Sequence, residues 1–370
     1  MSSDLNNSTK SDNRFHFPGL NGIRAYAALS VLIIHTKQNY SEMRSQQAVI
    51  KVLDILAIDA QIAVNFFLVL SGFLITYLLF YEKKEKETIN KKGFYIRRIL
   101  RIWPLYYLIV ILCLVVLPVL IKQDYPLSNF PISKSILIIL FLPNFVGSLG
   151  PLTHLWSIGL EWQFYLVWPW VLKSSKRFLQ VCFGILIVKS LIAPIIFSFT
   201  DESVRALFLS LRFECLAIGA LGAYIVFHDH RILKIFYSPF GQLFGFLGLL
   251  FLMFYDPPLT YINHLFTSVI FIVFIINSAT NPEKWFNLDN KVFDALGKIS
   301  YGIYMYHYPI LYLALLFLNN TGIAEGRLYN YILYSMTILL TLIVSMLSFY
   351  WFEKRILNLK DKFAVIKTEI

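Results

Sequence analysis

Two ionisable side chains lie inside the first long apolar stretch of the chain, residues 20–36. Arg24 and His35 are eleven residues apart. A helix would therefore place them within about 20° of each other on one face and about 16 Å apart along its axis. Ionisable groups inside a membrane span are costly and are functional candidates. His35 could act as a general base, whereas in the alternative interpretation Arg24 reaches the inner surface and His35 caps the helix.

Residues 154–169, HLWSIGLEWQFYLVWP, form the densest group of polar and aromatic side chains. Ser157 and Glu161 are four residues apart and therefore share a helical face. A carboxylate beside a histidine suits general-base catalysis because it fixes the tautomer and stabilises the imidazolium, so we predict that His35 and Glu161 are catalytic. Alternatively, Glu161 is a buried ion-pair partner and the aromatic residues form an interfacial belt. The candidate substrate contacts in this segment are His154, Trp156 and Ser157.

Three arginines mark the start of another apolar stretch, FYIRRILRIWPLYY. Arg98 and Arg101 are three residues apart and point the same way on a helix. Guanidinium groups on one face suit phosphate binding, although the same residues could simply anchor the helix at the cytoplasmic surface. Farther along, the segment GKISYGIYMYHYPI places Ser300 and His307 on one face with Tyr304 between them, as substrate contacts or as packing residues.

The composition excludes a soluble protein. Hydrophobic residues make up 57% of the 370 residues and charged residues 15%, whereas soluble domains carry about 45–50% and about 25%. The mean hydropathy is +0.63. Lipid must therefore solvate much of the apolar surface, which excludes a secreted enzyme, a nucleic-acid-binding domain and a disordered scaffold. The meaning of the formal net charge of +11 then depends on where the basic residues lie along the chain.

Apolar stretches that approach the length of a membrane helix recur along the whole chain. They lie near 20–36, 56–80, 99–121, 136–149, 157–172, 178–199, 204–227, 236–254, 259–279, 299–318 and 329–352. Because 136–149 is short and contains Pro143, we predict about ten transmembrane helices plus one re-entrant segment around 136–157. This topology puts 23 of the 33 lysines and arginines on the cytoplasmic side, with both termini cytoplasmic. The predicted fold class is an all-α integral membrane protein of the cytoplasmic (inner) membrane.

Six segments in the same order resemble the motifs of the acyltransferase-3 family of multi-pass membrane acyltransferases. They are FPGLNGIRAYAALSVLIIHT with Arg24 and His35, FFLVLSGFLITYLL, RILR with Arg98 and Arg101, HLWSIGLEWQFYLVWP, LGKISYGIYMYHYPI and the closing FEK. The chain departs from the family pattern at Asn65, where an acid is common, and at Trp162, where a second acid often follows Glu161. The second departure leaves Glu161 as the only acid of that motif.

The resemblance covers roughly residues 15–355 and implies transfer of an acyl group, usually acetyl, from cytoplasmic acyl-CoA to a hydroxyl group of a cell-surface or exported polysaccharide or glycolipid. Acetyl-CoA would be a co-substrate, and no bound cofactor or metal is expected. Whether His35 is a general base or carries the acyl group covalently is left open by the residues. Arg24, Arg98 and Arg101 would hold the acyl-CoA, and His154, Trp156, Ser157, Tyr304 and His307 would contact the substrate.

We expect one membrane domain over residues 16–355, between a cytoplasmic polar tail at 1–15 and a cytoplasmic basic tail at 356–370. The expected partners are the acyl-CoA donor, a carbohydrate or glycolipid acceptor and membrane lipid, but no nucleic acid. A transporter or flippase for a glycan-related substrate is the alternative. It would explain charges inside the membrane, but it predicts inverted repeats that the two halves of the sequence do not show.

Overall fold

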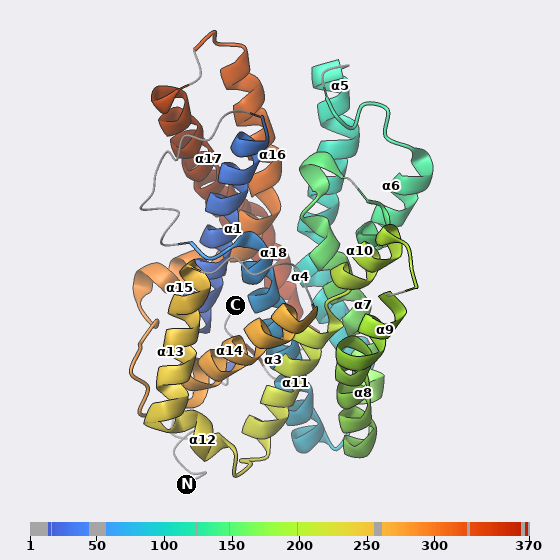
Figure 1. The fold of residues 1–370 in the computed structure, drawn as a ribbon, viewed down its shortest axis with the longest axis vertical. Helices are drawn as coiled ribbons and strands as arrows, with labels where there is room; N and C mark the ends of the chain where they lie inside the picture. Colours follow the sequence, from blue (N-terminus) through green and yellow to red (C-terminus); the bar gives the residue numbers. More distant parts are fainter. Residues whose placement is uncertain are drawn as a thin grey trace.

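The apolar stretches form helices because lipid offers no hydrogen-bond partner to the backbone, and a helix satisfies those groups internally. Figure 1 shows the resulting helix bundle in a computed structural model. The structure describes residues 14–15, 17–43, 57–122, 125–147, 149–197, 199–254, 261–323, 326–363 and 367–368.

The described chain is helical apart from one pairing of two short strands. The longer helices are α1 (Leu20–Met43), α3 (Ala60–Lys86), α4 (Lys91–Ile111), α7 (Leu155–Val171), α8 (Ser175–Ile187), α11 (Phe213–Phe227), α13 (Pro239–Phe254), α14 (Tyr261–Thr280), α16 (Ser300–Asn319) and α17 (Arg327–Ser348). The shorter ones are α5 (Leu117–Ile121), α6 (Ile132–Ile139), α9 (Ala193–Phe197), α10 (Glu202–Ser210), α12 (Leu233–Tyr237), α15 (Lys291–Lys298) and α18 (Lys354–Lys360).

The remaining elements are single turns and the strand pair. Three π-helical segments continue long α-helices, namely η2 (Leu112–Val116), η6 (Val188–Ile192) and η7 (Phe349–Glu353). Three 3₁₀ turns are η4 (Pro143–Phe145), η5 (Gly150–Leu152) and η8 (Asp361–Phe363). Strands β1 (Arg14–Phe15) and β2 (Lys367–Thr368) pair in parallel, so the first and last described segments lie side by side.

Seven helical stretches within the described residues are long and apolar enough to cross a membrane. They are Ala60–Lys86, Lys91–Ile121, Ser175–Phe197, Glu202–Phe227, Asn263–Thr280, Ser300–Asn319 and Arg327–Lys360. Helices α7 and α13 are shorter, at 17 and 16 residues, and α1 carries polar side chains along much of its length. The all-helical, apolar character is therefore confirmed, whereas the predicted number of about ten spans and the re-entrant segment stay predictions.

Two of the apolar stretches are interrupted, one in the predicted re-entrant segment and one in a predicted span. The stretch at 136–149 is not one helix: α6 ends at Ile139, and the turn η4 begins at Pro143, whose ring cannot donate a backbone hydrogen bond. The stretch at 204–227 is divided between α10, which ends at Ser210, and α11, which begins at Phe213. Apolar residues continue on both sides of each interruption, although Arg212 and Glu214 lie at the second.

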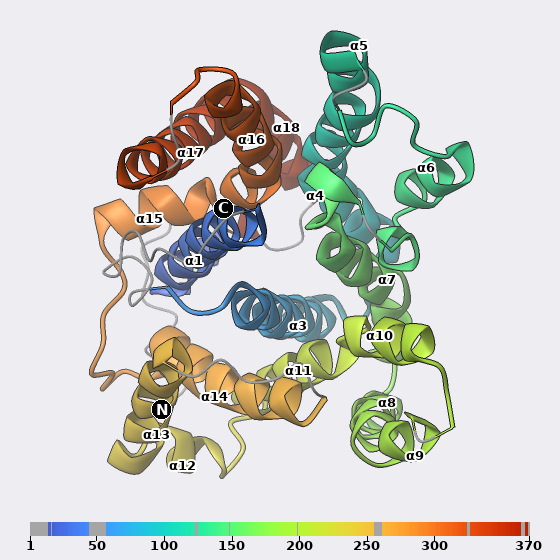
Figure 2. The same ribbon diagram turned by 45° about the horizontal axis from the view of Figure 1, so that its top comes forward.

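Helix α3 runs through the middle of the bundle and contacts α1, α7, α11 and α14 (Figure 2). Its closest approach is to α11, where two glycines let the backbones touch. A Cβ atom on Gly72 would overlap the carbonyl oxygen of Leu216, and one on Gly219 would overlap that of Val69. Small residues serve this purpose widely in membrane helix pairs. The contact fixes the position of Ser71, the neighbour of Gly72.

We expect Gly72→Ala to lower the melting temperature of the purified protein by several degrees, because overpacking costs about 1–3 kcal/mol. Thermal unfolding in detergent measures the effect. Gly184→Ala in α8 is the matched control, since a Cβ atom there would meet nothing within 4 Å. Equal melting temperatures for the two variants would mean that the α3–α11 contact is not tight.

Candidate active site

A cavity of about 90 Å³ lies where α1, α3, α4, α7 and α16 meet, and we call it the central cavity. Each of the five helices contributes a polar side chain to its wall. These are Arg24, Ser71, Arg101, Glu161 and Tyr304, joined by Ser157, Tyr165, Ser300 and Tyr301. Five residues predicted from the sequence as site residues, namely Arg24, Arg101, Ser157, Glu161 and Tyr304, therefore meet at one cavity.

Glu161 is held within the cavity wall by two hydroxyl groups. Ser71 and Tyr165 both donate to Oε1 of Glu161. These two hydrogen bonds join Glu161 to α3 and to its own helix, and the role that the sequence suggested for it beside His35 stays a prediction. Its hydrogen bonds make it part of the polar wall beside Arg24 and Arg101.

The arginines of α4 divide into a structural one and two at the cavity. Arg97 donates to Glu82 at 2.8 Å and to the carbonyl oxygen of Phe363 at 2.7 Å, so it ties α3, α4 and the C-terminal segment together. Arg101 lines the cavity. The guanidinium group of Arg98 lies 5.7 Å from the ring centre of Tyr165, which also lines it.

The central cavity carries an excess of positive charge. Arg24, Arg98 and Arg101 contribute three guanidinium groups. Among the described residues that line the cavity, Arg24 and Arg101 are accompanied by a single carboxylate, that of Glu161, and Arg98 lies beside the lining residue Tyr165. Because guanidinium groups remain charged and bind phosphate oxygens well, this surplus suits an anionic ligand.

His35 forms a hydrogen-bonded pair with His307. The Nδ1 atom of His35 lies 2.9 Å from Nε2 of His307, and the two rings are nearly parallel. The Nδ1 atom of His307 lies 2.6 Å from the carbonyl oxygen of Tyr304, which can only accept. His307 therefore carries its proton on Nδ1. Its Nε2 accepts a hydrogen bond from the protonated Nδ1 of His35. This tautomer leaves the lone pair of His35 on Nε2, as a general base requires.

His154 and Tyr308 complete an aromatic group around this pair. The ring centre of His154 lies 5.0 Å from that of His307, and its ring stacks on Tyr308 at 5.5 Å. Tyr308 in turn contacts the ring of His35 at 4.6 Å. We call His35, His154 and His307 the histidine group.

Tyr304 connects the central cavity to the histidine group. Its hydroxyl group lies 2.6 Å from Oγ of Ser157 and donates to the carbonyl oxygen of His154 at 2.9 Å, while its own carbonyl accepts from His307. Its ring lines the cavity. Tyr304 therefore contacts both the central cavity and the histidine group.

Trp156, predicted as a substrate contact, lies outside the cavity wall. The guanidinium group of Arg212 lies 4.8 Å from its ring centre. Arg212 also donates to the backbone carbonyl of Gln61 at 2.9 Å and to the side chain of Asn65 at 2.7 Å. It therefore links the interruption between α10 and α11 to both α3 and α7, and Trp156 is one of its partners.

A second buried group of charges lies beside this interruption and was not predicted. Glu214 is within 3.5 Å of Lys189 and 3.1 Å of His264. Lys189 also donates to the carbonyl oxygen of Phe208, in the last turn of α10, at 2.5 Å.

Two residues of the cavity wall were missed although a signal existed. Tyr165 is four residues after Glu161, so the two share a helical face. Ser71 belongs to one of the motifs that carry the family resemblance. Pairing across helices, as between His35 and His307, leaves no such local trace because 272 residues separate the partners.

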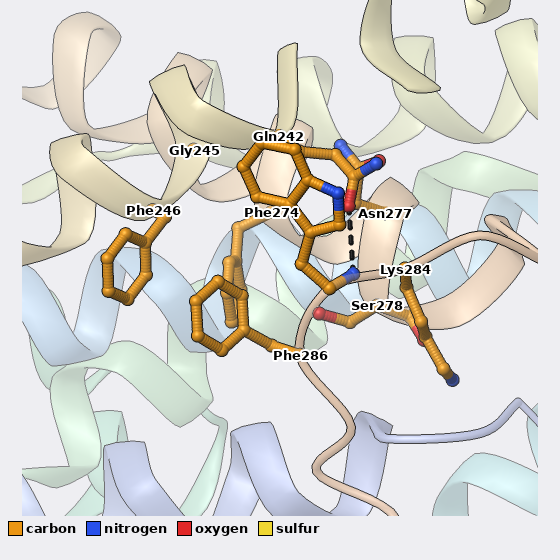
Figure 3. A pocket seen from close by; sticks show the side chains of 9 residues that line it. Gln242, Gly245, Phe246, Phe274, Asn277, Ser278, Lys284 and Phe286 are labelled. Atoms are coloured by element: carbon orange, nitrogen blue, oxygen red, sulfur yellow. Dashed lines mark hydrogen bonds between the residues drawn. The ribbon is translucent and has the colours of Figure 1, made fainter. Parts of the chain in front are cut away.

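Figure 3 shows a second, smaller cavity of about 20 Å³ between α13, α14 and the loop that follows α14. The rings of Phe246 and Phe286 stack there, and the backbone of Trp285 donates to Gln242 at 2.9 Å. Its one charged group, on Lys284, donates to the carbonyl oxygen of Ser278. These contacts hold the loop against the bundle and leave the central cavity as the candidate site.

An apolar helix bundle that encloses arginines, a glutamate and histidines defines a functional membrane protein. A family model described as an acyltransferase domain matches residues 17–351. The chain therefore belongs to the acyltransferase-3 family.

Two similar proteins come from Staphylococcus aureus. O-acetyltransferase OatA of strain NCTC 8325 is 28% identical over 363 residues, which cover 91% of this chain and 57% of the relative. A protein of strain COL with a provisional O-acetyltransferase name is 27% identical over 374 residues, which cover 93% of this chain and 58% of the relative. The chain thus spans little more than half the length of these relatives. No solved structure matches it significantly.

Arg212→Met should lower the melting temperature by roughly 5–10 °C, because removing one partner of a buried charge network costs about 3–5 kcal/mol. Calorimetry or dye-monitored unfolding in detergent measures this. Arg205→Met is the control, since Arg205 is exposed and donates only to the carbonyl oxygen of Thr200. A shift no larger than the control's would contradict the linking role of Arg212.

Proposed function

We propose that the protein is a membrane-bound O-acyltransferase that moves an acyl group, acetyl in the simplest case, from cytoplasmic acyl-CoA to a hydroxyl group of a cell-surface or exported polysaccharide or glycolipid. One observation carries the proposal. Tyr304 lines a cavity with Arg24 and Arg101 on its wall, and its backbone carbonyl binds His307, the hydrogen-bond partner of His35. Cations for phosphate groups at one end and a base at the other are what transfer from acyl-CoA requires.

The reaction follows from the tautomer of His35. Its Nε2 accepts the proton of the acceptor hydroxyl group while the hydroxyl oxygen forms a bond to the thioester carbonyl carbon. The carbon–sulfur bond then breaks, and the CoA thiolate takes the proton from the His35 imidazolium, which regenerates the base. His307 holds the Nδ1 proton of His35 and so keeps the lone pair on Nε2 throughout.

The donor and the acceptor reach the site from opposite sides in this proposal. The arginines lie toward the cytoplasmic surface of the inner membrane, where the basic residues of the sequence concentrate. Both tails are cytoplasmic, and the pairing of β1 with β2 supports a common side for them. The membrane domain of residues 16–355 carries the donor site, and the tails at 1–15 and 356–370 flank it.

The substrate contacts proposed from the sequence lie at different positions relative to the central cavity. Ser157 and Tyr304 line the central cavity and can contact the acyl group directly. His154 and His307 contact it only beyond Tyr304. Trp156 can contact the acceptor only if the acceptor and Arg212 both pack against its ring.

A transporter or flippase for a glycan-related substrate is the second candidate, and one observation favours it. The α10–α11 interruption lies beside buried Lys189, Glu214 and His264, and interrupted helices next to buried charges are typical of transport sites. Membrane vesicles incubated with radiolabelled acetyl-CoA separate the two. Label that joins glycan only when the protein is present supports transfer, whereas unlabelled glycan that crosses the membrane supports transport.

His35→Ala should lower acetyl transfer more than 100-fold, because a general base contributes about 10²–10⁴-fold to such reactions. Transfer of label from acetyl-CoA to glycan in membranes measures it, with immunoblots to show equal accumulation of protein. His230→Ala, on the exposed turn after α11, is the control and should transfer normally. Normal transfer by His35→Ala would remove His35 from the mechanism.

Combining Arg98→Ala with Arg101→Ala should weaken acetyl-CoA binding at least tenfold, since one hydrogen bond to a charged group contributes about 1.5–3 kcal/mol. Calorimetric titration of the purified protein gives the dissociation constant. Lys92→Ala, exposed on the same helix, is the control. If the double variant binds acetyl-CoA as tightly as the control does, the two arginines only anchor α4 at the membrane surface.

A further inference from the structure

Acyl transfer needs one group that the site described so far does not supply. When the acceptor oxygen attacks the thioester, the carbonyl oxygen gains negative charge in the transition state. A pre-placed N–H or O–H donor beside that oxygen commonly contributes 10²–10³-fold to the rate. The donor must lie near His35, because the base and the attacked carbonyl are separated only by the acceptor oxygen.

The hydroxyl groups of the central cavity do not provide this donor, because each has already committed its proton. They belong to Ser71, Tyr165, Ser157, Tyr304, Ser300 and Tyr301. Two donate to Glu161, and two donate to the backbone carbonyls of Gly297 and Ile102. The remaining two share their protons with each other and with the carbonyl oxygen of His154.

The arginines are at the wrong end of the cavity. Arg24 is eleven residues from His35 on the same helix, which separates their Cα atoms by about 16 Å along the axis. Arg101 lies close to Arg24, since their charges interact. Both groups can reach phosphate oxygens, but neither lies beside the base.

Tyr308 and His154 both pack against the histidine pair, and His154 is the one that carries a ring N–H. His154 is 1% exposed, and neither ring nitrogen reaches a partner at hydrogen-bond geometry, although the backbone of Met305 lies near the ring. A buried donor or acceptor left without a partner costs about 1–3 kcal/mol, so such a group calls for an explanation. Its ring lies against His307, the hydrogen-bond partner of His35.

We propose that His154 is a further catalytic residue, whose ring N–H donates a hydrogen bond to the thioester carbonyl oxygen as the acceptor attacks. The orphaned nitrogen then gains its partner only in the transition state, which is the condition for an effect on rate instead of binding. The inference rests on the proposed acyl transfer. It assigns the base and the oxyanion donor to two histidines on α1 and at the start of α7.

A matched pair of variants tests this role. His154→Gln and His154→Met have side chains of nearly equal length, and only the glutamine carries an N–H donor. We expect His154→Met to lower kcat for acetyl transfer 100- to 1000-fold and His154→Gln to retain at least ten times more activity than His154→Met. The dissociation constant of acetyl-CoA should stay within about twofold of the wild type in both. His154→Phe, which keeps the ring contact with Tyr308, should match His154→Met.

The controls separate this inference from the proposal on which it rests. His230→Gln should transfer acetyl groups normally, and the melting temperature of each variant reports folding. Equal kcat for the Gln and Met variants, or kcat within threefold of the wild type for His154→Met, would overturn the donor role. A tenfold loss of acetyl-CoA affinity in all three variants would also overturn it, because His154 would then be a structural residue. A wild-type protein that transfers no acetyl group would instead overturn the proposed function and this inference with it.

Discussion

The bundle has to hold ionised side chains in a place where neither water nor lipid can solvate them. Each buried charge therefore needs partners from other helices, and those partners determine where the helices pack. Glu161 draws hydroxyl groups from α3 and from its own helix, and Arg212 joins α11 to α3 and to Trp156 of α7. The arginines around the central cavity are the exception, since they outnumber the nearby carboxylates. Elsewhere in the bundle, buried charges are matched by partners from neighbouring helices. At the central cavity this matching is incomplete, and positive charge is in excess.

Much of the site could be predicted from local spacing, because helical periodicity shows which side chains share a face. Arg24, Arg101, Ser157, Glu161 and Tyr304 were predicted in this way or by motif, and they line one cavity. What spacing cannot show is which faces meet. His35 was expected to pair with a carboxylate, yet its partner is His307, because α1 packs against α16 at that level. The interruption between α10 and α11 was also not predicted, since apolar residues continue on both sides of Arg212 and Glu214.

The π-helical segments explain a further part of what periodicity misses. Segments η6 and η7 carry Lys189 and Glu353, and both side chains are buried within long, otherwise α-helical spans. A wider turn adds a residue to the helix and so rotates everything after it relative to a 3.6-residue pattern. A helical wheel drawn through either segment would misplace the charge. Glu353 accepts a hydrogen bond from Ser348, at the end of α17, at 3.0 Å.

The residues of the cavity wall are synthesised at different times. Arg24 is made 280 residues before Tyr304, an interval of roughly 14–56 s at ordinary elongation rates. For that time α1 carries a guanidinium group whose eventual neighbours on α4, α7 and α16 do not all exist. The wall of the central cavity is therefore complete only after Tyr304 of α16 has been made, 280 residues after Arg24.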